Sequence, residues 1–174
     1  MRNRHTMKAI VCDRYGPPDV LRLDEVERPT PRDDQVLVMV YASSLNAADL
    51  EIMGGSLFAR ISGPFRPRNR IPGSDVAGRV VEVGKKVKRL KIGDAVFGDL
   101  FMCGCGAFAE YVAASEAALM LKPDSISFED AATIPPGGQD RPSEPSRQAP
   151  SQEREEGPDQ WRGRRHGHVR RKDR

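Results

Sequence analysis

The chain has 174 residues and a formal net charge of +3, which is too small to indicate a nucleic-acid-binding protein. Eighteen of its 28 basic and 18 of its 25 acidic residues precede residue 137, so the excess positive charge lies in the last 38 residues. The three cysteines are an odd number and do not indicate a disulfide framework. No apolar run suits a signal peptide or a membrane span. These features predict a soluble cytoplasmic protein with one domain and room for an appendage.

The first third of the chain predicts a series of strands. Residues 1–6 are polar and precede a second methionine, Met7, so we expect a frayed extension or a true start at Met7. Strands are expected over residues 7–13 and 20–27, paired across the turn cluster at residues 15–18. Residues 35–44 form the strongest predicted strand, with apolar side chains on both faces, so we expect it to be covered on both sides.

A short helix is expected over residues 46–53. Asn46 suits its N-cap, Asp49 lies where a carboxylate favours the helix dipole, and a Gly-Gly pair ends it. Residues 56–70 then contain two prolines and four arginines, and we expect an irregular segment there. It is either a solvated mobile loop or a functional one.

The central stretch, residues 71–84, organises the rest of the chain. A Pro-Gly turn precedes a β-branched run that ends at Gly84, and Gly93-Asp94 can form the hairpin turn before the next strand. Strands so closely spaced and punctuated by glycine predict a small, nearly closed β-barrel. Further strands are expected over residues 108–114 and 119–121. A last helix is expected after Ser127, with Asp130 near its third position.

These segments resemble a known family of enzymes. Residues 7–10 (Met-Lys-Ala-Ile), 43–49 (Ser-Ser-Leu-Asn-Ala-Ala-Asp), 71–84 and 128–135 are similar to the catalytic domain of the medium-chain dehydrogenase/reductases, in particular the zinc-free quinone oxidoreductases related to zeta-crystallin. The resemblance covers residues 7–136. It implies a mainly β, chaperonin-10-like, partly open β-barrel with short helices, and hydride transfer between NADPH or NADH and a small-molecule substrate.

The resemblance also predicts that no zinc is bound. Where zinc-dependent relatives have a cysteine this chain has Asn46, and where they have a histidine-glutamate pair it has Ser74-Asp75. Neither Asn46 nor Ser74 is a useful zinc ligand. The structural zinc lobe of those relatives needs four cysteines, and this loop offers only Cys103 and Cys105.

Without a metal, a carbonyl oxygen that gains charge must be stabilised by hydrogen-bond donors. The resemblance makes the Asn46 amide the candidate catalytic group, although Asn46 could equally be a helix cap only. Substrate-pocket candidates are Ser44, Asp49, Glu51 and Ser74. Of these, Asp49 better suits a structural role than contact with a substrate. Glu51 stands where many quinone reductases have a tyrosine, so a strict quinone preference is not implied.

Residues 137–174 contain only Ala149, Trp161 and Val169 as hydrophobic residues, so we expect a disordered tail. The glycine-rich turn of a cofactor-binding domain is missing, and the chain alone is therefore expected to be inactive. Read one base out of frame, residues 157–174 permit Val-Leu-Ile-Asn-Gly-Ala-Gly-Gly-Gly-Met-Gly-Thr-Phe-Ala-Val-Lys-Ile-Ala. That sequence resembles the missing turn, and residues 137–143 also permit a family-like continuation. We therefore expect a frameshift near Pro136.

Two other readings remain open. The chain could be a non-enzymatic β-barrel binding module, or a barrel with a nucleic-acid-binding tail whose basic residues are Arg162, Arg164, Arg165, Arg170 and Arg171. The family resemblance favours the oxidoreductase reading over both of them. The sequence names neither the substrate nor the oligomeric state.

Overall fold

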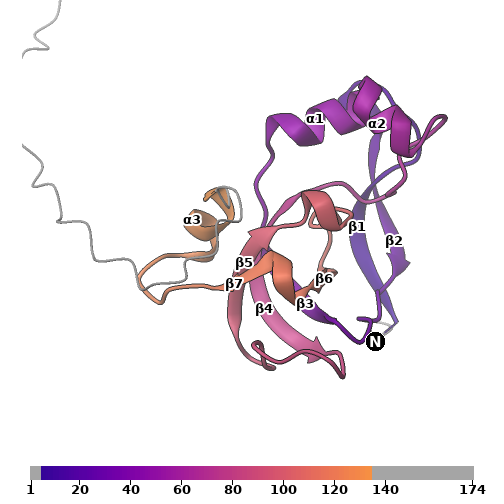
Figure 1. The fold of residues 1–174 in the computed structure, drawn as a ribbon. Coiled ribbons are helices and arrows are strands. Elements are labelled where there is room, and N and C mark those ends of the chain that lie inside the picture. The colour runs from indigo at the N-terminus through magenta and orange to yellow at the C-terminus, as the bar shows by residue number, and fades with distance from the viewer. Residues whose placement is uncertain (1–4, 135–174) are drawn as a thin grey trace, which may run out of the picture. The chain divides into compact units, whose positions relative to one another are not determined.

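The computed structural model describes residues 5–134, so the expectations for residues 1–4 and for the tail lie outside the described residues. The described part is mainly β, with short helices (Figure 1). The strands are β1 (Thr6–Cys12), β2 (Leu21–Glu27), β3 (Gln35–Ala42), β4 (Asp75–Val83), β5 (Ala95–Asp99), β6 (Tyr111–Ser115) and β7 (Leu119–Leu121). The α-helices are α1 (Ala47–Gly54), α2 (Leu57–Ser62) and α3 (Phe128–Thr133), and the 3-10 turns are η1 (Pro18–Val20), η2 (Phe101–Cys103) and η3 (Glu116–Ala118).

The strands form a partly open barrel, as expected. Five of them make an antiparallel sheet in the order β6-β3-β4-β5-β7, and β1 pairs with β2 as an antiparallel hairpin. The hairpin joins the sheet near the start of β6, where the Ile10 N–H donates to the Phe108 carbonyl (2.8 Å) and Ala9 bridges Ala109. Strand β6 therefore begins at Tyr111 and not at Phe108, because the residues before it bond to β1.

The core lies between the inner faces of the strands. Val36, Leu37 and Val38 of β3 are fully buried, which confirms that the first half of this strand is covered on both faces. The second half departs from that expectation, since Tyr41 is half exposed. The Tyr41 ring stacks on Phe128 of α3 (centroids 4.6 Å apart), and α3 packs against β3, β4 and β5.

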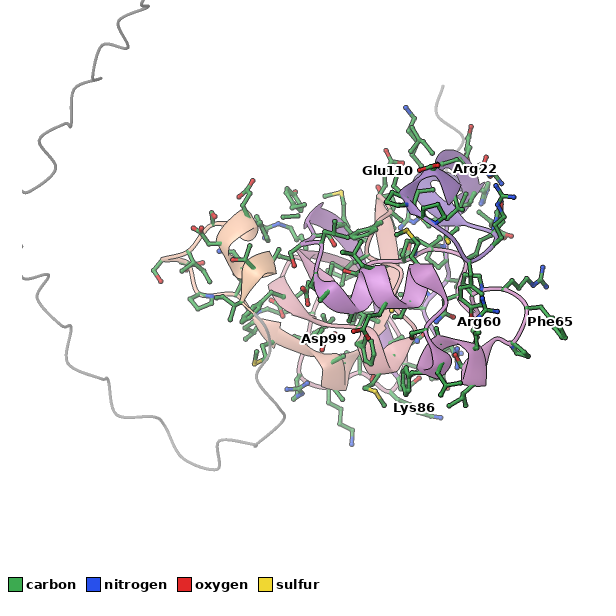
Figure 2. The ribbon with its side chains drawn as sticks, turned by 90° about the horizontal axis from the view of Figure 1, so that it is seen from above. Arg22, Arg60, Phe65, Lys86, Asp99 and Glu110 are labelled. Carbon is green, nitrogen blue, oxygen red and sulfur yellow. The ribbon has the colours of Figure 1, made fainter. Side chains whose placement is uncertain are left out.

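Helix α2 corrects the expectation of an irregular segment over residues 56–70. Ser56 caps the helix by accepting a hydrogen bond from the Ala59 N–H. The helix buries only Ala59, and Leu57 and Ile61 are 81% and 76% exposed, so no apolar periodicity marks it in the sequence. Figure 2 shows Phe65 projecting from the loop that follows α2.

The end of that loop, at Arg70, is tied to the β1–β2 hairpin by ion pairs. Arg70 and Arg22 each bridge Asp13 and Asp24, which gives an alternating cluster of four charges. Hydrogen bonds from Arg70 and then Arg22 lower the pKa of Asp13 to about 2. Arg70, the last residue of this segment, is therefore held against the β1–β2 hairpin. None of the helices between residues 5 and 134 is long and apolar enough to cross a membrane.

Candidate active site

Asn46 begins helix α1 and caps it, as predicted. Its side-chain oxygen accepts hydrogen bonds from the N–H groups of Ala48 (2.9 Å) and Asp49 (3.2 Å). In turn, the Asp49 carboxylate accepts a hydrogen bond from the Asn46 backbone N–H (3.1 Å), which completes a capping box. The cap fixes the orientation of the Asn46 amide, because its oxygen must face the helix.

The amide nitrogen of Asn46 points the other way, toward the start of β4. It donates to the Ser74 hydroxyl oxygen and to the Asp75 carboxylate, both at 2.9 Å. The two roles considered for Asn46, helix cap and hydrogen-bond donor, therefore use different ends of one amide. Both amide hydrogens are engaged by the protein, so a substrate oxygen would have to replace one of these two acceptors.

Asp49 is the most deeply buried of the candidate residues apart from Ser74. It is 3% exposed, and its carboxylate also accepts from the Ser74 N–H (3.2 Å). Burial raises the pKa of Asp49, the backbone N–H groups of Asn46, Ser74 and Gly73 lower it, and the nearby Asp75 charge raises it, with a net upward shift. Asp49 thus joins the N-terminus of α1 to the start of β4.

Ser44 belongs to the same cluster and Glu51 does not. The Ser44 hydroxyl donates to the Asp75 carboxylate, beside the contact from Asn46. Glu51 is exposed on α1, and its backbone carbonyl accepts hydrogen bonds from the Gly55 and Ser56 N–H groups at the C-terminal end of the helix. Four of the five candidate site residues named from the sequence are therefore brought together. Asp75, which the sequence offered only as half of a replaced metal-ligand pair, is the acceptor that joins Asn46 and Ser44.

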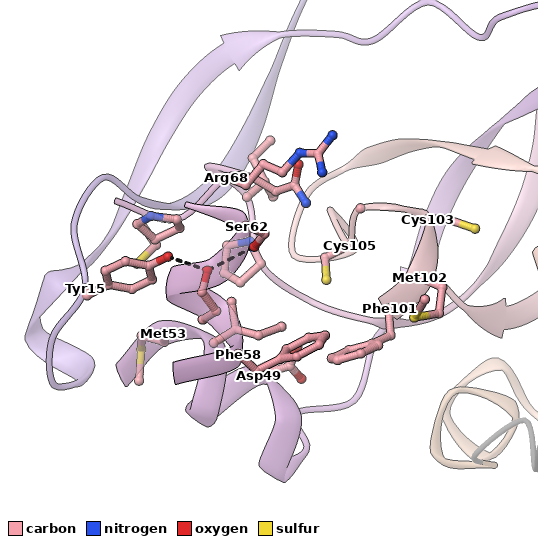
Figure 3. Close-up of a pocket in the computed structure, with 18 of the residues that line it drawn as sticks. Tyr15, Asp49, Met53, Phe58, Ser62, Arg68, Phe101, Met102, Cys103 and Cys105 are labelled. Atoms are coloured by element: carbon pink, nitrogen blue, oxygen red, sulfur yellow. Dashed lines mark hydrogen bonds between the residues drawn. The ribbon is translucent and has the colours of Figure 1, made fainter. Parts of the chain in front are cut away.

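A pocket of about 370 Å³ adjoins this cluster, and Asp49 lies in its wall (Figure 3). Helices α1 and α2 contribute Met53 and Phe58, and η2 contributes Phe101. The Phe58 and Phe101 rings are nearly parallel, with centroids 6.1 Å apart and an angle of 10° between planes. Sequence reasoning missed these aromatic residues, because they come from distant segments and neither belongs to a motif.

The three cysteines also line this pocket. Cys12 is buried, Cys103 exposed and Cys105 intermediate, and all three are free thiols. Burial raises the pKa of each of them. Within residues 5–134, no group of three or more His, Cys, Asp or Glu side chains is placed to hold a metal ion.

Comparison with known proteins gives a consistent picture. Residues 32–124 match the alcohol dehydrogenase GroES-like domain. A 2-methylene-furan-3-one reductase from Solanum lycopersicum is 41% identical over 136 residues, which cover 74% of this chain and 34% of that protein. The human quinone oxidoreductase is 33% identical over 129 residues, 74% of this chain and 37% of the relative.

The solved structures agree. The quinone oxidoreductase from Coxiella burnetii superposes with a TM-score of 0.70 at 38% identity, over 76% of this chain and 42% of that one. The chain thus spans about one third to two fifths of the length of these relatives. The matched residues include both the Asn46 helix and the Ser74-Asp75 strand. This chain belongs to the family of alcohol dehydrogenase GroES-like domains, within the medium-chain dehydrogenase/reductase superfamily.

Proposed function

We propose that residues 7–136 are the catalytic domain of a zinc-independent reductase that transfers hydride from NADPH or NADH to a conjugated carbonyl compound, either a quinone or an enone. The hydrogen-bonded group of Asn46, Ser74 and Asp75 carries this proposal. It lies where the resemblance places the metal ligands of zinc-dependent relatives. The relatives support the substrate class, since one is described as an NADPH-dependent alkenal/one oxidoreductase and others as quinone oxidoreductases.

In this proposal Asn46 stabilises the charge that develops on the substrate oxygen. A carbonyl that enters beside Ser74 accepts one amide hydrogen, while the other hydrogen remains on Asp75. The cap holds the amide in place during the exchange, because its oxygen stays bonded to the Ala48 and Asp49 N–H groups. A preorganised donor of this kind stabilises an oxyanion better than mobile water does.

The pocket supports a flat substrate. Phe58 and Phe101 offer two nearly parallel faces, and Met53 and Met102 add polarisable sulfur. Asp49 and Arg68 add polar groups to the lining of the pocket. A conjugated ring or enone chain suits such a surface better than a flexible polar alcohol does.

The cofactor must be bound mainly by residues outside the described range. A nicotinamide cofactor supplies the hydride, and a dinucleotide is ordinarily held on a parallel β-α-β unit. Every strand pair within residues 5–134 is antiparallel, so these residues do not fit that role. We propose that residues 137–174 are read out of frame and that the shifted frame encodes the start of the cofactor domain.

The test is an activity assay on the frame-restored protein. The nucleotide sequence around residues 135–138 defines the correction, and the restored protein is assayed with NADPH against a naphthoquinone, an enone, a saturated ketone and, in reverse, a primary alcohol. Turnover of the first two compounds is expected. Asn46→Ser keeps the capping oxygen and removes both amide donors, so turnover should fall about 10²-fold. Absence of any reductase activity would refute the proposal.

One observation favours the alternative of a binding module. Leu57, Ile61 and Phe65 expose large apolar side chains around α2, with exposed fractions of 81%, 76% and 93%. Such a surface suits contact with another protein surface. The assay separates the two readings, since a binding module would not oxidise NADPH. The nucleic-acid-binding alternative rests on arginines that lie outside the described residues.

A further inference from the structure

Helix α2 and the loop after it have two different sides. Ala59 and Pro67 are buried and line the pocket. Leu57, Ile61 and Phe65 come from the same segment, and most of each of these side chains is exposed. Figure 2 shows Phe65 projecting away from the rest of the domain. The segment therefore forms one wall of the pocket and also exposes large apolar side chains to solvent.

The same segment carries only positive charge. Residues 52–74 contain four arginines and neither aspartate nor glutamate. Arg70 is neutralised by its ion pairs with the β1–β2 hairpin. Arg66 and Arg68 are exposed, and neither forms an ion pair within the part of the chain that the structure describes. Unpaired positive charge therefore accompanies the exposed apolar side chains. Together they form the α2 surface, which consists of Leu57, Ile61, Phe65, Arg66 and Arg68.

The composition of the α2 surface favours lipid over protein as its partner. An interface with another protein is depleted of charged residues at its apolar centre. Here Arg66 directly follows Phe65, and Arg60 directly precedes Ile61, so the surface has no charge-free centre. At a bilayer, by contrast, apolar side chains enter the boundary between headgroups and acyl chains while arginines bind the lipid phosphates. Anionic lipids also complement the positive charge of the surface.

We propose that the α2 surface docks the domain on anionic membranes. Leu57, Ile61 and Phe65 enter the bilayer at the level of the headgroups, and Arg66 and Arg68 bind lipid phosphate groups. Because Arg68 also lines the pocket, docking brings the pocket beside the bilayer. The inference goes beyond the proposed reductase function and does not depend on it, since neither a cofactor nor a carbonyl substrate takes part.

A second basic segment provides an internal comparison. Residues 85–91 contain five cations, but acidic groups adjoin them: Asp33 pairs with Lys86 (3.4 Å), and the Glu116 carboxylate accepts from the N–H groups of residues 88–90. This segment follows the end of β4, whereas α1 follows the end of β3, which pairs with the start of β4. Since α2 contacts α1, the second segment and the α2 surface lie at opposite ends of the sheet (Figure 1).

The experiment is co-sedimentation of the full chain with vesicles of phosphatidylcholine, either alone or with about one third phosphatidylserine, in about 0.1 M salt. A triple variant, Leu57→Ser with Ile61→Ser and Phe65→Ser, removes the apolar side chains. A double variant, Arg66→Gln with Arg68→Gln, removes the charges. All five side chains are exposed, so we expect both variants to fold, which circular dichroism checks. Phe65→Ser alone makes the same comparison if the triple variant does not fold.

The matched controls come from the second basic segment and its neighbour. Ile92→Ser removes an apolar side chain that is 64% exposed, and Lys86→Gln with Lys88→Gln removes two exposed charges. Strand β4 has nine residues and so separates this segment from the α2 end of the sheet by about 25–30 Å. That exceeds the screening length of about 10 Å. Every variant keeps residues 137–174, so any binding by their basic residues is common to all.

We expect the wild-type chain to bind the anionic vesicles at least about tenfold more tightly than the neutral ones. The triple variant should lower the partition coefficient at least about tenfold, because three apolar side chains no longer enter the bilayer. The double arginine variant should lower it about tenfold on anionic vesicles and change it little on neutral ones. Both controls should stay within about twofold of wild type.

Four results would overturn the inference. Equal binding of the wild type and the triple variant would contradict insertion, and equal losses in the controls would place the binding on residues 85–91. A dimer that forms without lipid, and that the triple variant abolishes in sedimentation velocity, would assign the surface to a second copy of the chain. Loss of vesicle binding in the frame-restored protein would assign it to the restored residues.

Discussion

Replacing Asn46 should separate its two structural contributions. Asn46→Ala removes the cap of α1 together with the donors to Ser74 and Asp75. Asn46→Ser keeps an oxygen that can cap the helix, since serine is nearly as good an N-cap as asparagine, and removes only the amide donors. The difference between the two variants is therefore the contribution of the cap.

The magnitudes follow from the contacts. Loss of an N-cap costs about 1 kcal/mol, within a range of about 0.5–2 kcal/mol. Loss of the donors leaves the Asp75 carboxylate, which is 9% exposed, with one side-chain donor fewer, at a cost of about 1–3 kcal/mol. We expect Asn46→Ala to lower the free energy of unfolding by about 2–4 kcal/mol, and Asn46→Ser by about 1–3 kcal/mol.

Urea denaturation of the full chain, followed by circular dichroism, measures both values. With an m-value of about 1–3 kcal/mol/M, the Asn46→Ala midpoint should fall by about 1 M or more. Asn69→Ala is the control, because Asn69 is exposed and has no hydrogen bond in the described part of the chain; it should stay within about 0.5 kcal/mol of wild type. If Asn46→Ala stayed equally close to wild type, the hydrogen-bond network argued for Asn46 would be wrong.

Three further predictions concern the scaffold. Hydrogen bonds from Arg70 and Arg22 lower the pKa of Asp13 to about 2, so the stability that Asp13 contributes is present above about pH 4 and is lost as pH falls toward 2. Asp13→Asn should therefore make the urea midpoint depend less on pH over this range. An unchanged pH dependence would contradict the pairing. Burial raises the pKa of Glu116, but hydrogen bonds from the N–H groups of Arg89, Leu90 and Lys88 give a net lowering. Glu116→Gln should weaken these hydrogen bonds and speed amide hydrogen exchange at residues 88–90. Unchanged exchange would refute the role of the Glu116 carboxylate. Gly93→Ala places its Cβ in open space at φ +96° and should lower the free energy of unfolding by about 1–2 kcal/mol. Gly73→Ala, at φ +95°, would also place its Cβ 2.7 Å from the Phe108 nitrogen and should lower it further. Equal denaturation midpoints for the two variants would contradict the close packing at Gly73.

Local signals predicted most of the fold. The β-branched runs gave β3, β4 and β5, and Asn46 and Ser127 marked the first residues of α1 and α3 because a cap depends only on neighbours in sequence. Gly93 has the positive φ expected of the hairpin turn. The pairing of residues 108–110 with β1 was not predictable in this way, since it joins segments about 100 residues apart.

The site was predictable only where it forms a motif. Asn46, Ser74 and Asp49 were found because they match short segments of the family. Asp75 was read as half of a replaced metal-ligand pair, and its role as acceptor for Asn46 needed the distance between α1 and β4. Phe58 of the unexpected helix α2 and Phe101 of η2 meet only through the fold, so no pattern in the sequence indicated their contact.

We propose above all that this domain supports hydride transfer to a carbonyl compound without a metal. The most direct measurement is the turnover number of the frame-restored protein with NADPH and a quinone or enone, taken on a preparation whose zinc content is determined on the same sample. We expect full turnover with negligible zinc and no change on adding zinc or a chelator. Turnover that rises in proportion to bound zinc, and that is lost with a chelator, would contradict it.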